Sequence, residues 1–545
     1  MLKKSFLFVL LGLLLIACSK QAKRVNDVFR YNESKGISTL DPAFAKSQTI
    51  IWPVSQLFNG LVQMNENTEI VPCIAKKWNI SEDAKTYTFV LRSDVFFHKH
   101  PLFKEKRKVV ANDFIYSLKR LFDSKTASPG AWLMNYLNKD TLDNGFWAPN
   151  DSTLIIQLKQ AFPGFLGILS MPYCSVVPQE IVEHYGKSFR SHPIGTGPFY
   201  LKKWREGEKL VFRKNIDYFE KDKDGNKLPY LEGIAITFIS DKQSEFLEFS
   251  KGNIDFISGI HSSYKDKLLT HSGELKQNYK TQFQLSKSPY LNTEYLGFLV
   301  SSEKSIVHSA YFRKAVNFGF DRKKMLAYLR NNIGSAAEQG FIPKGLPSFE
   351  EKNQYFVYNK DSALYYLQLA KQSYGSHLPE ITLTTTSDYV DLCEYIQHEL
   401  SEIGIKINID ISSGATFRDQ VATSKLEFFR GSWIADYPDA ENYLSLFYSK
   451  NFAPDGPNYT HFSDSLYDCL YEQSLVETKL SERQETYKTM NRILVNKAAV
   501  VPLFYDEVIR FSQRNIRNFN TNAMNMLFLK NVYKSDFDTA DSAAK

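Results

Sequence analysis

Apolar and polar residues follow two different periods along this chain. Residues 86–91 alternate between polar and apolar side chains, as expected for a strand with one buried face. Residues 111–122 instead carry their apolar side chains on one stripe, which predicts an amphipathic helix that Asn112 or Asp113 could cap. By the same criteria, strands are expected at 199–204 and 234–239, and helices at 244–250 and 483–495. Strands and helices are therefore interspersed, which indicates a mixed α/β fold.

A strand–helix–strand unit is predicted between residues 381 and 411. Apolar runs at 381–386 and 405–411 flank a helical pattern at 390–403, and Gly404 stands at the end of that helix. No repeat of fixed period is visible along the chain, which argues against solenoids and propellers.

Length and composition narrow the class of protein. A chain of 545 residues exceeds the size at which one hydrophobic core keeps growing, so two or three domains are expected. The aromatic content of 14% is typical of a globular protein and argues against disorder. The formal net charge of +7 is small for this length, and the one dense basic run, residues 104–108, is short. We therefore predict no nucleic-acid partner.

The first 18 residues combine a positive start, an apolar run and a cysteine. Lys3 and Lys4 precede the apolar residues 6–16, a run shorter than the roughly 20 residues that a membrane-spanning helix needs. The Leu-Ile-Ala-Cys sequence that ends at Cys18 resembles the lipobox of bacterial lipoproteins. The resemblance implies a signal peptide, acylation of Cys18 and a tether at residues 18–26. An ordinary signal peptide with an incidental cysteine is the alternative.

This leader has consequences for localisation. The signal peptide is expected to cover residues 1–17, and no later stretch approaches the apolar length of a spanning helix. We therefore expect a lipid-anchored protein of the cell envelope that faces the periplasm, with either the inner or the outer membrane holding the lipid. Four further cysteines could pair in three ways in an exported protein: Cys73, Cys174, Cys393 and Cys469.

Metal and catalytic motifs are weak or absent in the sequence. His98 and His100 could share one face of a strand, but without a third ligand we interpret them as part of an exposed turn. There is no G-x-S-x-G, no H-E-x-x-H and no phosphate-binding glycine loop. We predict no metal, no cofactor and no enzymatic activity.

Residues 428–439 form the most informative stretch for ligand binding. An apolar run that ends at Ser432 predicts a buried strand reaching the edge of its sheet. Trp433, Asp436 and Tyr437 follow within a few residues. A buried carboxylate needs a cationic partner because an unpaired charge is costly to desolvate. Either a ligand ammonium or an internal arginine would satisfy that need.

Collinear segments along most of the chain resemble the family 5 solute-binding proteins of ABC importers, the oligopeptide- and dipeptide-binding group. The segments are 38–42, 57–61, 109–120, 171–173, 193–199, 213–219, 252–255, 313–322 and 433–437. The Pro-Ile-Gly-Thr-Gly-Pro-Phe segment at 193–199 is the most recognisable of them. The resemblance implies an α/β, two-lobed periplasmic-binding-protein-like fold of type II, cluster C, with an extra inserted domain.

The domain boundaries are also expectations from this resemblance. Residues 27–46, 182–285 and 505–545 would form a discontinuous lobe I. Residues 47–181 would form the inserted domain, and residues 286–504 would form lobe II.

The resemblance implies roles for individual residues. In peptide-binding members, the aspartate of this motif holds the α-amino group of the ligand, so Asp436 would do so here. Arg430 matches a position that meets the C-terminal carboxylate in some members, with a structural arginine as the alternative. Backbone groups around Ser432 and Ile434 are expected to hydrogen-bond an extended peptide.

Three further residues are candidates for the walls of the site. Trp433 and Tyr437 would pack against the ligand or belong to the core, and Glu33 is a weaker candidate. The implied function is a monomeric receptor that captures short peptides between its lobes and delivers them to the permease subunits of an ABC importer. The alternatives are a metal complex or another non-peptide solute as the ligand, or a surface lipoprotein without a transport role.

Overall fold

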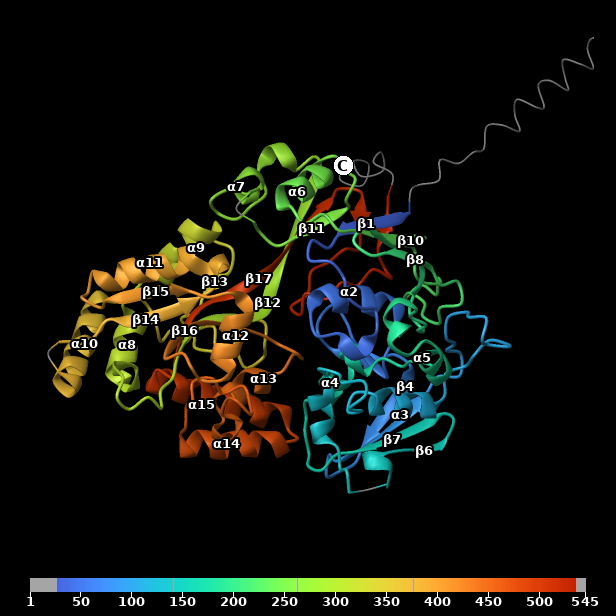
Figure 1. The fold of residues 1–545 in the computed structure, drawn as a ribbon, viewed down its shortest axis with the longest axis horizontal. Coiled ribbons are helices and arrows are strands. Elements are labelled where there is room, and N and C mark those ends of the chain that lie inside the picture. Colours follow the sequence, from blue (N-terminus) through green and yellow to red (C-terminus); the bar gives the residue numbers. More distant parts are fainter. Residues whose placement is uncertain (1–26, 141, 262, 376, 536–545) are drawn as a thin grey trace, which may run out of the picture.

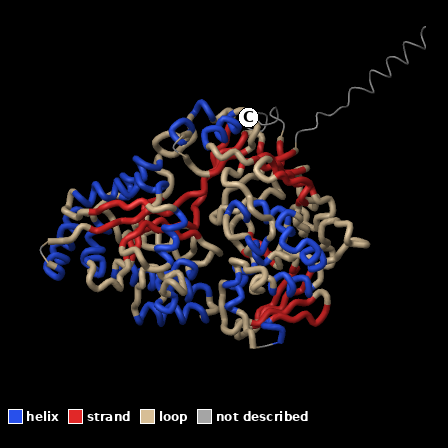
Figure 2. The backbone as a smooth tube through the Cα atoms, viewed as in Figure 1, coloured by secondary structure: helices blue, strands red, loops and turns tan. Residues whose placement is uncertain are grey.

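The computed structural model describes residues 27–535 apart from 141, 262 and 376. The predicted signal peptide, Cys18 and the tether lie outside the described residues, as do residues 536–545 of the expected lobe I. The chain forms two lobes (Figure 1). Two long strands, β12 (Phe283–Phe298) and β17 (Val500–Gln513), run from one lobe to the other, as Figure 2 shows.

Lobe I is built on a four-stranded sheet in the order β1-β10-β9-β8. The strands are β1 (Val28–Asn32), β10 (Gly233–Thr237), β9 (Lys209–Lys214) and β8 (Phe199–Arg205). β1 runs parallel to β10, whereas the other neighbours are antiparallel. The first strand of the lobe thus pairs with a strand some two hundred residues later, so this part of the fold is discontinuous in sequence.

A second sheet lies within the expected inserted domain. It has the order β4-β5-β7-β6 and is antiparallel throughout. Its strands are β4 (Ala75–Ile80), β5 (Thr86–Leu91), β7 (Thr153–Gln157) and β6 (Phe146–Asn150). The helices of this region are α2 (Gln48–Leu57), α3 (Ala111–Lys119), α4 (Phe165–Leu169) and α5 (Gln179–Tyr185).

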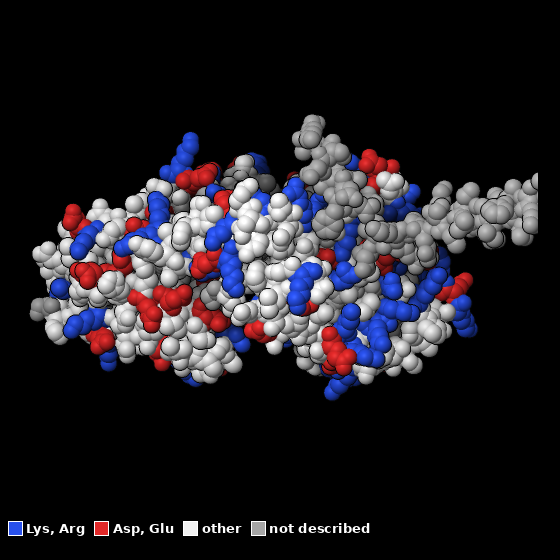
Figure 3. Space-filling model, turned by 90° about the horizontal axis from the view of Figure 1, so that it is seen from above, with Lys and Arg blue, Asp and Glu red and all other residues white. Residues whose placement is uncertain are grey.

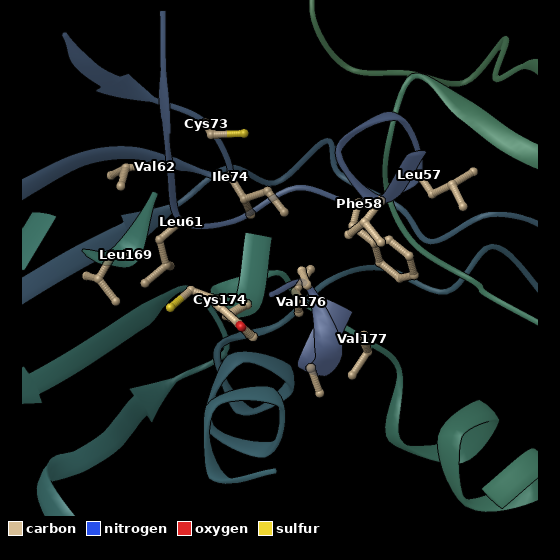
Figure 4. Close-up of a cluster of buried hydrophobic side chains, with 14 of the residues drawn as sticks. Leu57, Phe58, Leu61, Val62, Cys73, Ile74, Leu169, Cys174, Val176 and Val177 are labelled. Atoms are coloured by element: carbon tan, nitrogen blue, oxygen red, sulfur yellow. The ribbon is translucent and has the colours of Figure 1, made fainter. Parts of the chain in front are cut away.

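The two sheets share one hydrophobic core. Phe29 of the lobe I sheet and Phe89 of the second sheet belong to the same cluster of buried side chains. Figure 4 shows part of this cluster, in which Leu57 and Phe58, at the end of α2, lie on one side and Cys73 and Ile74 on the other. The inserted segment is therefore packed onto lobe I as part of one body, and the expected domain boundaries stay a prediction.

The glycines of the 193–199 segment allow a close approach to the end of α2. A Cβ on Gly195 would lie 2.1 Å from the Leu57 carbonyl oxygen, and one on Gly197 would lie 2.4 Å from the Leu57 carbonyl carbon. His98 contacts the same glycine segment. Its Nε2 lies 3.0 Å from the Gly197 carbonyl oxygen, and the backbone N–H of Gly195 donates to its Nδ1 over 3.3 Å.

These contacts correct one expectation. His98 is buried, so the interpretation of His98 and His100 as an exposed turn is wrong for His98. Burial lowers the pKa of His98 to about 4, which keeps the imidazole neutral. His98 therefore supports the glycine segment rather than facing solvent.

Lobe II contains a larger sheet in the order β11-β17-β12-β16-β14-β15, with β13 paired to β17. The shorter strands are β11 (Phe256–Ser258), β13 (Ser335–Ala336), β14 (Ile381–Thr385), β15 (Ile407–Ile411) and β16 (Phe428–Ile434). β14 and β15 are parallel and joined by α11 (Val390–Ser401), which confirms the predicted strand–helix–strand unit.

Helices surround this sheet (Figure 1). They are α8 (Ala310–Phe318), α9 (Arg322–Arg330), α10 (Lys360–Tyr374), α12 (Gly414–Ala422), α13 (Glu441–Leu444), α14 (Ser465–Val476) and α15 (Leu480–Lys497). Two more, α6 (Lys242–Ser250) and α7 (Lys265–Leu268), pack near β11 and the far ends of the long strands. The large sheet therefore reaches from lobe II to the junction with lobe I.

Most predicted elements are confirmed, with shifted ends. The strand predicted at 86–91 is β5, and the helix predicted at 111–122 is α3. The expected cap of α3 is wrong because the helix already begins at Ala111. Asp113 instead lies in the first turn, where its carboxylate accepts the backbone N–H of Val110 over 2.8 Å and pairs with Arg107 at 2.6 Å.

The surface charges, the cysteines and the helix lengths bear on the expected class of protein. On the face seen in Figure 3, acidic and basic side chains are interspersed over both lobes. All four described cysteines are free thiols: Cys73, Cys174 and Cys393 are buried and Cys469 is exposed. None of the described helices has both the length and the apolar character needed to span a membrane.

Candidate ligand-binding site

A cavity of about 350 Å³ is lined by residues of both lobes. One wall comes from residues 45–64 and another from residues 170–175, next to Trp132. The segment 524–530 supplies a third wall. Lobe II contributes Tyr290, Ile434, Ala435 and Asp436. The cavity therefore lies where a bound solute would touch both lobes, and its volume is within the usual range for small-ligand sites.

Asp436 reaches the cavity because β16 ends just before it. The backbone N–H of Ala435 donates to the Leu291 carbonyl oxygen over 2.9 Å, which is the last backbone contact to β12. The backbone N–H of Asp436 then donates to Oδ1 of Asn442 over 3.2 Å, and the same oxygen accepts Trp433 Nε1 over 3.0 Å. Asn442 thus fixes the turn that presents Asp436 to the cavity.

The Asp436 carboxylate has no cationic partner in the protein. Among the described residues, no lysine, arginine or histidine forms an ion pair with it. The side chain is exposed to the water of the cavity, but the surrounding protein desolvates it enough to raise its pKa. Such a group can accept a ligand ammonium, which supplies both the missing charge and hydrogen bonds.

Arg430 has an internal partner. Its side chain is buried within β16, and its guanidinium forms an ion pair with Glu294 of β12. The guanidinium carbon also lies 3.1 Å from the centroid of the Tyr389 ring. Arg430 is not among the residues that line the cavity. The geometry favours the structural alternative, and a contact with a peptide carboxylate stays a prediction.

One edge of β16 is open beside the cavity. Residues 428–434 pair with β12 along one edge, whereas β14 meets β16 only at Phe429. No other described strand pairs with the second edge beyond that point. Ser432 turns its hydroxyl to Asn292 and Glu294, and Ile434 is largely exposed at the cavity. An open edge of this kind can accept an extended peptide as an added strand.

Tyr437 lies at a contact between the lobes. It is buried, and its hydroxyl donates to the Glu441 carboxylate. Its ring meets Phe162 of the inserted segment edge to face, at 6.3 Å between centroids. A Cβ on Gly167 of α4 would lie 3.1 Å from the Tyr437 Cβ, so this glycine makes room for the side chain. Tyr437 therefore fits the core alternative, as does half-buried Trp433.

Glu33 lies outside the cavity lining. Its backbone N–H donates to the Thr237 carbonyl oxygen over 2.9 Å, continuing the pairing of β1 with β10. Its carboxylate accepts the backbone N–H of Lys35 over 3.2 Å, and burial raises its pKa. The structure does not bring Glu33 together with Asp436 in this cavity.

Several cavity residues were not found from the sequence. Lys46, Tyr173 and Tyr290 line the cavity, as does the segment 524–530. These residues come from distant parts of the chain. Of them, Tyr173 stands in the 171–173 segment that resembles the family, but nothing in that segment marked it as a site residue. Of the described residues, no group of three or more His, Cys, Asp or Glu is arranged to hold a metal ion.

Residues 69–455 match the family model of bacterial extracellular solute-binding proteins, family 5 Middle. The chain belongs to this family. It is 23% identical over 527 residues to the dipeptide-binding protein DppE of Bacillus subtilis, covering 92% of this chain and 91% of that protein. It is 25% identical over 496 residues to heme-binding protein A of Haemophilus influenzae, covering 88% of this chain and 87% of that protein.

The fold agrees with solved structures of such proteins. The periplasmic binding protein DppA from Helicobacter pylori, in complex with the peptide STSA, superposes with a TM-score of 0.77 at 21% identity, covering 93% of this chain and 98% of that chain. The predicted family and the two-lobed α/β fold of type II are confirmed. The family consists of solute-binding proteins rather than enzymes, and the names of its members show that they bind different solutes.

Proposed function

We propose that this chain captures short peptides with a free amino terminus between its lobes and delivers them to an ABC importer. The observation that carries the proposal is the Asp436 carboxylate, which faces the cavity without a cationic partner among the described residues. A peptide ammonium would satisfy it. The similarity to proteins named for dipeptide binding and to a structure with a bound peptide supports this choice.

The open edge of β16 would hold the peptide backbone. Hydrogen bonds to main-chain groups between Arg430 and Ile434 do not depend on the side chains of the ligand. Such a receptor can therefore accept many sequences while requiring a free amino group at Asp436. Selectivity would come from the termini and the size of the cavity.

The two lobes would close around the ligand. β12 and β17 cross between them, so a small change in twist along these strands would move one lobe relative to the other. A peptide that touches both lobes stabilises the closed form, because a ligand favours the state in which it makes more contacts. The closed form would then present its surface to the permease.

The anchor is proposed from the sequence. Cys18 would carry a lipid after removal of residues 1–17 and hold a monomeric receptor at the periplasmic face of a membrane. Metabolic labelling with an alkyne fatty acid should mark the wild type, and Cys18→Ala should lose the label.

A similarity to a heme-binding protein keeps a non-peptide solute as the second candidate. Native mass spectrometry of residues 20–545, purified from the organism that encodes the chain, separates the two candidates. We expect bound masses of short peptides that are released on gentle unfolding and reduced by Asp436→Ala. Asp439→Asn is the matched control, since Asp439 lies nearby but faces Arg483 at 3.6 Å. A bound haem, metal complex or other non-peptide mass would contradict the proposal.

A further inference from the structure

Glu441 is a buried carboxylate of lobe II that is held by hydroxyl groups. It stands at the start of α13, and only 4% of the residue is exposed. The hydroxyls of Tyr437 and Tyr471 donate to its two carboxylate oxygens. No lysine, arginine or histidine of the described ranges forms an ion pair with it, and Arg483 of α15 pairs instead with Asp439, at 3.6 Å. The ionised form of Glu441 is therefore buried without a counter-charge.

The other ionisable groups that face Glu441 within lobe II supply no positive charge. They are Tyr467 of α14, Tyr487 of α15, and Asp436 and Asp439 in the turn before α13. Burial raises the pKa of Glu441 to about 7, the two aspartates act in the same direction, and the tyrosine hydrogen bonds act against it. The surroundings of Glu441 thus favour its protonated form.

Part of this burial comes from the inserted segment. The ring of Tyr437 packs edge to face against Phe162, and a Cβ on Gly164, just before α4, would lie 3.3 Å from Tyr437 Cε2. Tyr136 stacks on Phe162 with 4.3 Å between the ring centroids. Burial, and next the charge of Glu441, raise the pKa of Tyr136, so this residue of the inserted segment lies close to the carboxylate. A separation of the lobes would uncover the Tyr437 ring and admit water to Glu441.

We propose that Glu441 takes up a proton from water when the lobes close, so that mild acid favours the closed, peptide-bound form. This rests on the proposed function for the identity of the ligand. In the open form water solvates the carboxylate, which stays ionised at neutral pH. In the closed form the inserted segment excludes that water, and the buried charge becomes costly unless a proton neutralises it. Because the closed form binds the proton more tightly, a lower pH shifts the equilibrium toward closure.

Glu441 would act through the contact between the lobes and not through the ligand. It is not among the residues that line the cavity. Asp436, which does line it, would act in the opposite direction, because a protonated Asp436 holds an ammonium less well. A gain in peptide affinity on mild acidification that depends on Glu441 is therefore a signature of closure.

The test measures the affinity of an uncharged-side-chain tripeptide at pH 6 and pH 8 by isothermal titration calorimetry on residues 20–545. The wild type is compared with Glu441→Gln, which keeps the shape and removes the titration. Glu472→Gln is the matched control, since Glu472 of α14 also accepts a tyrosine hydroxyl, from Tyr448, but is exposed and pairs with Lys450 at 2.7 Å.

The ratio of the affinity at pH 6 to that at pH 8 should be about tenfold larger in the wild type and Glu472→Gln than in Glu441→Gln. Titrations at pH 7 in buffers of different ionisation enthalpy should show that the wild type takes up about half a proton more than Glu441→Gln on binding. Equal ratios and equal proton uptake would overturn the role of Glu441 and leave peptide binding intact.

A measurement without peptide separates this inference from the proposed function. If no variant binds the tripeptide, the proposed function fails, and energy transfer between dyes on exposed Cys469 of α14 and on Lys77→Cys of β4 reports the separation of the lobes. Closer lobes at pH 6 than at pH 8, with no such change in Glu441→Gln, would support the inference. A separation that is the same at both pH values would overturn it.

Discussion

Arg430 and Asp436 belong to one short segment, yet only Arg430 has an oppositely charged partner among the described residues. Arg430 lies within β16, where the neighbouring strand β12 supplies Glu294 as its partner. Asp436 lies past the end of the strand, where no described neighbour supplies a cation. Inside the sheet the pairing of β16 with β12 places a counter-charge beside Arg430. Beyond the end of the strand, the charge of Asp436 is stabilised by solvation or by a ligand. The same segment therefore holds one charge with an internal partner and one charge without an ion pair among the described residues.

The largest effect is expected when the cation of the buried ion pair, Arg430, is removed. Arg430→Met should lower the free energy of unfolding by about 3–5 kcal/mol, because Glu294 is left buried without a counter-charge. Urea denaturation followed by circular dichroism measures the loss. The double variant Arg430→Met with Glu294→Gln should regain most of the stability. A loss below about 1 kcal/mol in the single variant would show that the pair is not structural.

Glu441 shows a third arrangement, in which hydroxyl groups donate hydrogen bonds to a buried carboxylate. Its carboxylate accepts hydrogen bonds from Tyr437 and Tyr471, and burial raises its pKa from 4.5 to about 7. Between these two pH values, Glu441 keeps its proton in the native state but has lost it in the unfolded chain. The contribution of Glu441 to stability is therefore full below the lower value and is lost as the pH rises to about 7, by roughly 3 kcal/mol in all.

Denaturation at several pH values tests whether the contribution of Glu441 to stability falls as the pH rises. The difference in free energy of unfolding between wild type and Glu441→Gln isolates the group from other carboxylates. That difference should change by roughly 3 kcal/mol between about pH 4 and about pH 8, in favour of the variant at high pH. A difference that is constant with pH would contradict the raised pKa.

A smaller effect is expected at the contact between the lobes. Tyr437→Phe removes the hydroxyl that donates to Glu441 and keeps the ring against Phe162. It should lower the free energy of unfolding by about 1 kcal/mol and leave peptide affinity unchanged. If affinity fell while stability did not, Tyr437 would belong to the binding site instead of the core.

The smallest effect on stability is expected at Asp436. Its carboxylate is partly desolvated and has no ion pair in the described structure, so Asp436→Ala removes one side-chain hydrogen bond, with Asn442, and relieves the desolvation of the carboxylate. The free energy of unfolding should change by no more than about 0.5 kcal/mol, with a small gain as the favoured direction. A loss above about 2 kcal/mol would make Asp436 a structural residue.

Local patterns predicted the elements better than the contacts between them. The strict alternation at 86–91 is β5, and the strand predicted at 199–204 is β8. β17 extends to Gln513 because its later residues pair with β11 and β12 at the junction of the lobes, a neighbourhood that no local pattern encodes. His98 was misplaced for the same reason, since its partners are the glycines at 195 and 197.

The same contrast between local patterns and distant contacts applies to the candidate binding site. Asp436 was predicted because its segment, 433–437, resembles the motif whose aspartate holds the ligand in peptide-binding members of the family. The partner of Arg430 was not, because Glu294 is brought to it by the register between strands far apart in the chain. Lys46 gave no signal, since a single lysine before a helix is common and only the folded structure places it at the cavity.

The most direct test of the account is the affinity of Asp436→Ala for a tripeptide, measured by calorimetry beside the wild type and Asp439→Asn. We expect Asp436→Ala to lose about 2–5 kcal/mol of binding free energy, because the peptide ammonium would be desolvated without a carboxylate. N-acetylation of the peptide should weaken binding to the wild type and to Asp439→Asn, with little further effect on Asp436→Ala. Undiminished binding of the free tripeptide by Asp436→Ala would contradict the account, since the ammonium would then be held elsewhere or not at all.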